Sequence, residues 1–315
     1  MGADQDTVRR PRLVWGVVSG ILVALVVIVI SRMQVGRVPE KSGTEPVLSV
    51  YFHEENAVRR MPLETYLEGV VAAEMDPNWP IEALKAQAIV ARTFTLEKIQ
   101  RGGVPARGTD ASTDPKEFQA YDASKVNDRV REAVRSTRGQ VITYAGKPIQ
   151  AWFHASSGGK TATPEEGLGQ KMGTLPYVTV VLDMPASSPQ TWSRRFSASE
   201  VARAARTVGV PVGDSVSSIR IGKKGPSGRA ETIVINGKTV SAPALRLALG
   251  GERMKSTLLD DVRLEGDTVY MRGRGYGHGV GMSQWGAWVM ALRGKKAQDI
   301  VRYYYRGVKI ETMWQ

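Results

Sequence analysis

The chain of 315 residues contains no cysteine and only three histidines. The lack of cysteine excludes disulfides, thiolate metal sites and cysteine nucleophiles, but it does not define the compartment, because an exported bacterial protein can avoid cysteine altogether. His53, His154 and His278 are far apart in the sequence, and no two of them are spaced four residues apart on a helix. The sequence therefore predicts that the protein requires no metal and no other cofactor.

Negative charge is also scarce, since 31 Asp and Glu face 43 Lys and Arg and leave a net charge of +12. Such a balance favours an acidic polymer or an anionic surface as a partner, and nucleic acid, phospholipid and an anionic cell wall all qualify. The basic residues are scattered and no nucleic-acid-reading motif accompanies them, so we expect no nucleic acid partner. HASSGGKT at 154–161 ends like a phosphate-binding loop but has His154 where that loop needs glycine.

One long hydrophobic run, LVWGVVSGILVALVVIVI, occupies residues 13–30 and has nearly the length needed to cross a bilayer. Arginines precede it, and positive flanks stay in the cytoplasm. A cleaved signal peptide is the alternative, but the run is longer than a typical signal core and no A-x-A-like site follows it. We expect a single-pass cell-membrane protein with a cytoplasmic N-terminus at 1–12, a transmembrane anchor at 13–32, a linker at 33–45 and an extracytoplasmic domain at 46–315.

The remaining pattern mixes helices and strands in clumps, which predicts an α+β fold of helices and antiparallel β-hairpins forming a cleft. The strongest turn signal is Asn236-Gly237 within 230–241, and a second hairpin is expected over 139–155 around Ala145 and Gly146. A β-rich subdomain is expected at about 180–270. Other expected elements are strands at 47–52 and 267–273 and helices at 62–75, 80–100, 125–137, 283–293 and 297–305.

An acid stands at the end of an otherwise apolar helical stretch. Leu63, Leu67, Val70 and Glu74 share one side of the helix expected at 62–75. A carboxyl near a helix C-terminus feels unfavourable dipole charge, and apolar neighbours desolvate it, so both effects favour the protonated form. A general acid needs that form at neutral pH. The alternative is a solvated carboxylate that simply ends the helix.

The next helix, 80–100, is apolar around most of its circumference and carries two cations on one side. Lys85 and Arg92 are seven residues apart, so they lie within about 20° of each other on the helical wheel. Buried cations need partners, and a polar pocket shared with Glu74 would supply one. A purely structural ion pair is the alternative. Gln87 faces the other way on the same wheel.

Two stretches, YLEGVVAAEMDPNWPIEALKAQAIVARTF and GRGYGHGVGMSQWGAWVMALRGKKAQDIVRYYYRG, together resemble the SpoIID/LytB domain family. The resemblance runs from about residue 46 to the C-terminus and includes FQAY, FHASSGGKT, LPYV and ALRLALG. It implies a lytic transglycosylase that cuts peptidoglycan between N-acetylmuramic acid and N-acetylglucosamine and leaves a 1,6-anhydro end. The acid of the AAEM motif falls on Glu74. Resemblance to the sporulation members of this family further implies a role in engulfment. The substrate would be denuded glycan strands, and the partners would be an amidase and membrane-complex proteins.

The same resemblance supplies further candidates for binding substrate or orienting the acid, which are Lys85, Gln87, Arg92, Ser156, Ser157, Gly158, His278, Ser283 and Gln284. The glycine-dense stretch 272–287 is expected to form a cleft wall, the alternative being a tight turn before a helix capped by Ser283. Trp285 could stack on a sugar or fill the core. Asp76 is expected to cap or turn the chain, although a second catalytic carboxylate stays open there.

One carboxylate is sufficient for the implied reaction. Hydrolytic glycosidases usually need two, whereas a lytic transglycosylase lets the C6 hydroxyl of the sugar attack the anomeric carbon. Glu74 would then first donate a proton and later accept one. A non-catalytic wall-binding scaffold or an amidase-modifying protein, roles also found among relatives, is the alternative function.

Overall fold

The computed structural model describes residues 43–171, 173–183 and 190–315. The predicted anchor at 13–32 and all but the end of the predicted linker lie outside these residues. Within the three described ranges, no helix is both long and apolar enough to cross a bilayer.

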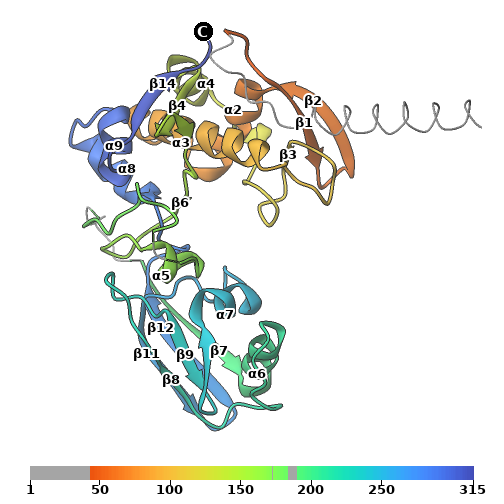
Figure 1. Ribbon diagram of the computed structural model, residues 1–315, viewed down its shortest axis with the longest axis vertical. Coiled ribbons are helices and arrows are strands. Elements are labelled where there is room, and N and C mark those ends of the chain that lie inside the picture. The colour runs from red at the N-terminus through yellow and green to blue at the C-terminus, as the bar shows by residue number, and fades with distance from the viewer. Residues whose placement is uncertain (1–42, 172, 184–189) are drawn as a thin grey trace, which may run out of the picture.

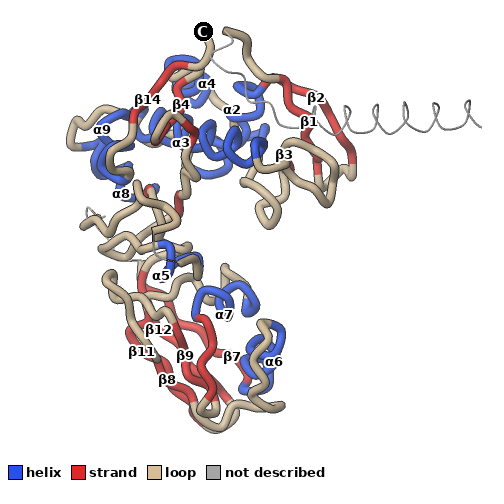
Figure 2. Tube along the Cα trace, viewed as in Figure 1, coloured by secondary structure: helices blue, strands red, loops and turns tan. Residues whose placement is uncertain are grey.

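The described chain forms two lobes stacked along the long axis of the molecule (Figure 1). The first lobe has a core made from residues 48–181 and 280–314. The second lobe has its own core, made from residues 192–271, so the chain leaves the first lobe, builds the second and returns. Figure 2 shows that helices dominate the first lobe and strands dominate the second. The mixed α+β class is confirmed, and the predicted limits of a β-rich subdomain stay a prediction.

The five helices expected from the sequence are present. The described helices are α2 (Leu63–Glu74), α3 (Ile81–Gln100), η1 (Ala123–Lys125), α4 (Asp128–Ser136), α5 (Pro164–Leu168), α6 (Ala198–Thr207), α7 (Ala242–Leu249), α8 (Gln284–Leu292) and α9 (Ala297–Tyr304). Of these, α5, α6 and α7 were not predicted from the sequence. Pro62 and Pro80 stand immediately before α2 and α3, where their fixed φ fits a helix start and their missing N–H costs nothing.

The strands form several small sheets. They are β1 (Val47–Phe52), β2 (Ala57–Pro62), β3 (Ala111–Ser112), β4 (Gln140–Tyr144), β5 (Lys147–Pro148), β6 (Phe153–His154), β7 (Thr191–Ser197), β8 (Ile219–Ile221), β9 (Thr232–Ile235), β10 (Lys238–Ser241), β11 (Leu259–Glu265), β12 (Thr268–Arg274), β13 (Met282–Ser283) and β14 (Lys309–Thr312).

The sheet pairing is antiparallel apart from two short contacts. The orders are β2-β1-β3 and β14-β4-β5 in the first lobe and β10-β9-β8 and β11-β12-β7 in the second, while β13 pairs with β6. Among the paired strands of the described residues, β1·β3 and β13·β6 are parallel. The hairpin at Asn236-Gly237 is confirmed, and both residues have positive φ, as the tight turn requires.

The hairpin expected over 139–155 is only partly correct. Its turn at Ala145 and Gly146 is confirmed, but the second arm, β5, ends at Pro148. The Ile149 N–H still donates to the Ile142 carbonyl at 3.1 Å, and the following residues then cross to a new partner, so that β6 pairs with β13. This crossing places HASSGGKT beside the glycine-dense stretch, where Ser156 and Tyr276 also exchange backbone hydrogen bonds at 3.0 and 2.8 Å.

Candidate active site

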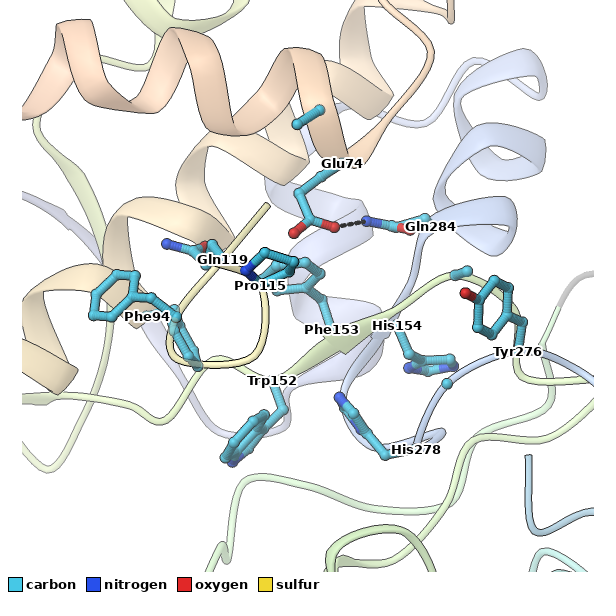
Figure 3. Close-up of a pocket in the computed structure, with 14 residues that line it drawn as sticks. Glu74, Phe94, Pro115, Gln119, Trp152, Phe153, His154, Tyr276, His278 and Gln284 are labelled. Carbon is cyan, nitrogen blue, oxygen red and sulfur yellow. Dashed lines mark hydrogen bonds between the residues drawn. The ribbon is translucent and has the colours of Figure 1, made fainter. Parts of the chain in front are cut away.

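A cavity of about 520 Å³ opens where the two lobes meet, with Glu74 on one side and His154, Tyr276 and His278 on the other (Figure 3). Its volume lies within the range of small-molecule sites. Six of the remaining wall residues are aromatic or amide-bearing, namely Phe94, Phe118, Gln119, Trp152, Phe153 and Gln284. Among the described residues that line it, Glu74 is the one carboxylate.

Glu74 is the last residue of α2 and its side chain reaches the cavity half-buried. Its Oε1 accepts the Ala120 backbone N–H at 3.0 Å, and its Oε2 accepts the Gln284 Nε2–H at 3.2 Å. Burial raises the pKa of the Glu74 carboxyl, and these two neutral hydrogen bonds oppose the rise without cancelling it. The Glu74 carboxyl should therefore stay protonated to a higher pH than an ordinary glutamate does.

Two histidines share Val280 as a backbone partner, and this fixes their tautomers. Val280 N–H donates to His278 Nδ1 at 3.1 Å, so the proton of a neutral His278 ring lies on Nε2. His154 Nδ1 lies 3.2 Å from the Val280 carbonyl, which can only accept, so that ring carries its proton on Nδ1. Burial lowers the pKa of His278 to about 3 and the pKa of His154 well below its usual range. Both rings are therefore neutral at physiological pH.

The second nitrogen of His154 is left without a partner. Its ring is 4% exposed, and Nε2 is a buried acceptor with no hydrogen-bond partner among the described residues. Gln119 Oε1 and Trp152 Nε1, from the same cavity wall, are likewise buried and unpaired there. Unpaired buried polar atoms are costly, so a cavity that gathers an acceptor, an amide and an indole donor is suited to a ligand rich in hydroxyl and amide groups.

The expected meeting of Glu74 with two cations is wrong. Arg92 instead binds Glu64, with Nε to Oε1 at 3.0 Å and Nη2 to Oε2 at 2.6 Å. Lys85 Nζ lies 3.3 Å from Glu82 Oε1 on its own helix. Since α2 and α3 fold back on each other across residues 75–80, Arg92 in the far half of α3 comes opposite the first turn of α2, where Glu64 lies.

The buried pair of Glu64 and Arg92 is a structural junction. Glu64 Oε1 also accepts the Gly139 backbone N–H and the Trp314 indole N–H, each at 3.0 Å. Arg92 Nη1 donates to the Gln140 carbonyl at 3.2 Å. One carboxylate and one guanidinium thus connect both long helices, the start of β4 and the C-terminus.

The other predicted residues divide between the cavity wall and its supports. Gln284 and His278 line the cavity. Ser283 caps α8, its Oγ accepting the Gly286 N–H at 3.1 Å. The glycine-dense stretch therefore both leads into a capped helix and forms part of the cavity wall through Tyr276, Gly277 and His278. Gln87 is fully buried, and neither polar atom of its side chain has a partner among the described residues.

Ser156, Ser157 and Gly158 do not line the cavity, and Ser157 contacts residues of both lobes. Ser157 Oγ donates to Asp183 at 2.5 Å, and the Ser157 carbonyl accepts Arg229 Nη2–H at 2.5 Å. Gly158 has a φ of +72°, and an added Cβ would lie 3.0 Å from the Gly275 nitrogen. Any substrate role of these three residues stays a prediction.

The structure also bears on the roles that the sequence left open for Asp76 and Trp285. Asp76 is exposed, its Oδ1 accepts the Asn78 N–H at 2.9 Å, and it does not line the cavity, so it turns the chain after α2. Trp285 is neither in the core nor in the cavity wall; it packs against Trp79 with ring centroids 4.8 Å apart and against Trp288, and all three rings are partly exposed.

Sequence reasoning missed Gln119, Trp152, His154 and Tyr276 as cavity residues. They lie in loops and short strands, where helical or alternating periodicity gives no signal. The available signal was the family motifs themselves, because FQAY supplies Gln119 and the Ala120 N–H, and FHASSGGKT begins at the cavity wall. Among the described residues no cluster of three or more potential metal ligands is found.

Comparison with known proteins shows the family of the chain. A family profile described as SpoIID, stage II sporulation protein, matches residues 51–144, which include Glu74 and Ala120. Stage II sporulation protein D of Bacillus subtilis (strain 168) is 35% identical over 294 residues, covering 86% of this chain and 82% of the relative. The chain belongs to the SpoIID family. The Bacillus amyloliquefaciens stage II sporulation protein D is 34% identical over the same shares of both chains.

A more distant relative extends the SpoIID comparison. A Bacillus subtilis (strain 168) protein named amidase enhancer is 29% identical over 299 residues, covering 78% of this chain and 40% of that protein. The name of this relative denotes action on an amidase.

Proposed function

We propose that this protein is a peptidoglycan lytic transglycosylase that cleaves the bond between N-acetylmuramic acid and N-acetylglucosamine and forms a 1,6-anhydro-muramyl end. The observation that carries the proposal is Glu74, the one carboxylate among the described residues of the cavity wall, whose pKa burial raises. A lone protonated acid fits an intramolecular displacement better than hydrolysis, which usually uses two carboxyls.

Both carboxyl oxygens of Glu74 accept an N–H hydrogen bond, Oε1 from Ala120 and Oε2 from Gln284. The Ala120 N–H can only donate, so we assign the acidic proton to Oε2. Gln284 faces Oε2, and its amide can present either a donor or an acceptor, so it accommodates both protonation states of the acid after rotation.

The reaction follows in two proton transfers. Glu74 Oε2–H protonates the glycosidic oxygen as the bond from the muramyl C1 to that oxygen breaks. The C6 hydroxyl of the same muramyl sugar bonds to C1, and its proton returns to Glu74. No water is consumed, and the acid ends in its starting state. The unpaired His154 Nε2 and Gln119 Oε1 would accept hydrogen bonds from sugar hydroxyl or acetamido groups.

Several wider roles belong to the same proposal. We expect action on denuded glycan strands during sporulation engulfment, together with an amidase and other membrane-complex proteins. We also expect the chain to be held at the cell membrane by residues 13–30, with the catalytic lobes outside. The net charge of +12 is favourable for work at an anionic wall.

The test uses the full chain in detergent, incubated with denuded glycan strands, with products identified by mass spectrometry. Wild type should release anhydro-muramyl ends, and Glu74→Gln, which preserves shape and the Ala120 hydrogen bond, should reduce them by roughly a hundredfold or more, as expected for loss of a general acid. Glu68→Gln on the same helix is the matched control and should retain activity. Equal activity of Glu74→Gln and wild type, or release of ordinary reducing ends, would contradict the proposal.

A second function is favoured by the relative named amidase enhancer. In that case the protein would stimulate an amidase without cleaving glycan. Glu74→Gln separates the two, because a scaffold should stimulate the amidase equally with either residue at position 74.

A further inference from the structure

A second cavity, of about 320 Å³, adjoins the Glu74 cavity and shares two of its wall residues, Phe94 and Trp152. Their ring centroids lie 5.5 Å apart in an edge-to-face contact. Aromatic rings are favourable surfaces for the apolar faces of sugars. A glycan lying in the first cavity can therefore continue across these rings into the second.

The second cavity contains a cation that lacks an acidic partner. Lys98 Nζ donates to the Glu117 backbone carbonyl and lies 4.8 Å from the centre of the Phe118 ring. Within the described residues Lys98 forms no ion pair. The other two charges of this cavity wall, Glu97 and Arg101, lie 3.6 Å apart and neutralise each other. The net local charge is thus positive.

The wall of the second cavity also contains the uncharged polar side chains of Gln150 and Trp152. Gln150 Oε1 and Trp152 Nε1 are buried, and neither has a hydrogen-bond partner in the described part of the chain. An acceptor, a donor and a half-buried cation around an aromatic wall are the groups needed to hold a sugar that carries an amide and a carboxylate.

We propose that this second cavity is a subsite for an acidic sugar, in which Lys98 binds the lactyl carboxylate of a muramyl residue. This inference rests on the proposed function, because it takes peptidoglycan glycan as the ligand. The lactyl carboxylate is free only where no stem peptide is attached, since a peptide converts it to an uncharged amide. The subsite would therefore select peptide-free strands by charge as well as by size.

The test compares two ligands that differ at one group. Alternating glucosamine–muramic acid oligosaccharides are prepared with free lactyl carboxylates or with the same carboxylates converted to methylamides. Binding to the full chain carrying Glu74→Gln, which prevents turnover, is measured by calorimetry in detergent. The free acid should bind roughly tenfold more tightly than the methylamide, as expected for one charge-assisted hydrogen bond.

Variants of the two neighbouring charges should move this preference in opposite directions. Lys98→Met should abolish it, Lys98→Arg should retain it, and Glu97→Gln, which removes the nearby negative charge, should increase it. Lys238→Met, on β10 of the second lobe, is the control and should leave the preference unchanged. A purely structural role of Lys98 would weaken binding of both ligands alike and would overturn the proposal.

Failure of the subsite can be distinguished from failure of the proposed function. If wild type produces anhydro ends from both ligands with equal kcat/KM, the subsite is wrong and the enzyme assignment stands. If no anhydro ends form but the free acid still binds more tightly in a Lys98-dependent way, the subsite stands as a glycan-binding site. Equal binding of both ligands refutes the subsite in either case.

Discussion

Replacing Arg92 by Met should destabilise the protein severely while leaving the chemistry of the cavity intact. Arg92 is fully buried, and its loss leaves the Glu64 carboxylate without its charge partner in the core. Removing one member of a buried ion pair costs about 3–5 kcal/mol. For a folded region of this size, such a loss lowers the midpoint of thermal unfolding by on the order of 10 °C.

The assay is thermal and urea unfolding followed by circular dichroism, with Arg131→Met as the matched control. Arg131 forms an exposed pair with Asp128, so its loss should cost less than about 1 kcal/mol. Adding Glu64→Gln to Arg92→Met removes the stranded charge and keeps an acceptor for Gly139 and Trp314. The double variant should therefore recover most of the lost stability.

Activity provides the decisive contrast. At a temperature well below its unfolding midpoint, Arg92→Met should cleave denuded strands with a kcat close to that of wild type. If Arg92 instead orients Glu74, kcat should fall without a large change in the free energy of unfolding. That outcome would refute the reasoning that places Arg92 in a structural junction.

The remaining predictions concern Glu74, His278 and Gly281. The folded pKa of Glu74 is raised from 4.5, so the free energy of unfolding of wild type should fall relative to that of Glu74→Gln as pH rises from 4.5 through the raised value. The kcat should fall over the same pH range. Equal dependence of the free energy of unfolding on pH in the two proteins would contradict this. His278 has its folded pKa lowered from 6.5 to about 3, so stability should fall as pH drops below 6.5, and His278→Asn should flatten that fall in an acid-unfolding titration. Gly281→Ala would place a Cβ 1.9 Å from the Trp152 carbonyl oxygen. The control is Gly294→Ala, where φ is similarly positive but the space is open and the expected loss of stability is roughly 1 kcal/mol. Gly281→Ala should lose well over that amount, and equal urea midpoints for the two variants would contradict the close approach.

Local elements were predictable from the sequence wherever one strong signal fixed them. The strand at 47–52 is found with the same limits, and α2 begins one residue after Pro62, as a proline before a helix requires. The turn at Asn236-Gly237 follows from the positive φ that these two residues tolerate. Such signals act over a few residues, so they need no knowledge of the tertiary fold.

The partners of charged residues were not predictable in this way. A helical wheel shows that Arg92 faces the core, but it does not show which acid of α2 comes opposite. The pairing depends on the short connection at 75–80, which makes α3 fold back along α2. The far half of α3 therefore comes opposite the first turn of α2. The cavity wall was equally hidden, since His154 reaches it through the parallel pairing of β6 with β13, which joins segments far apart in the sequence.

The corrected charge pairing has a direct consequence for the chemistry. Had Lys85 and Arg92 met Glu74, their positive charges would have lowered its pKa and disfavoured the protonated form that the proposed reaction requires. Arg92 is instead engaged by Glu64 and Lys85 by Glu82, so Glu74 receives only neutral donors from Ala120 and Gln284. Burial then outweighs the two neutral hydrogen bonds, and the pKa of Glu74 is raised. The protonation of Glu74 therefore also depends on Glu64 and Glu82, which hold Arg92 and Lys85 in ion pairs away from it.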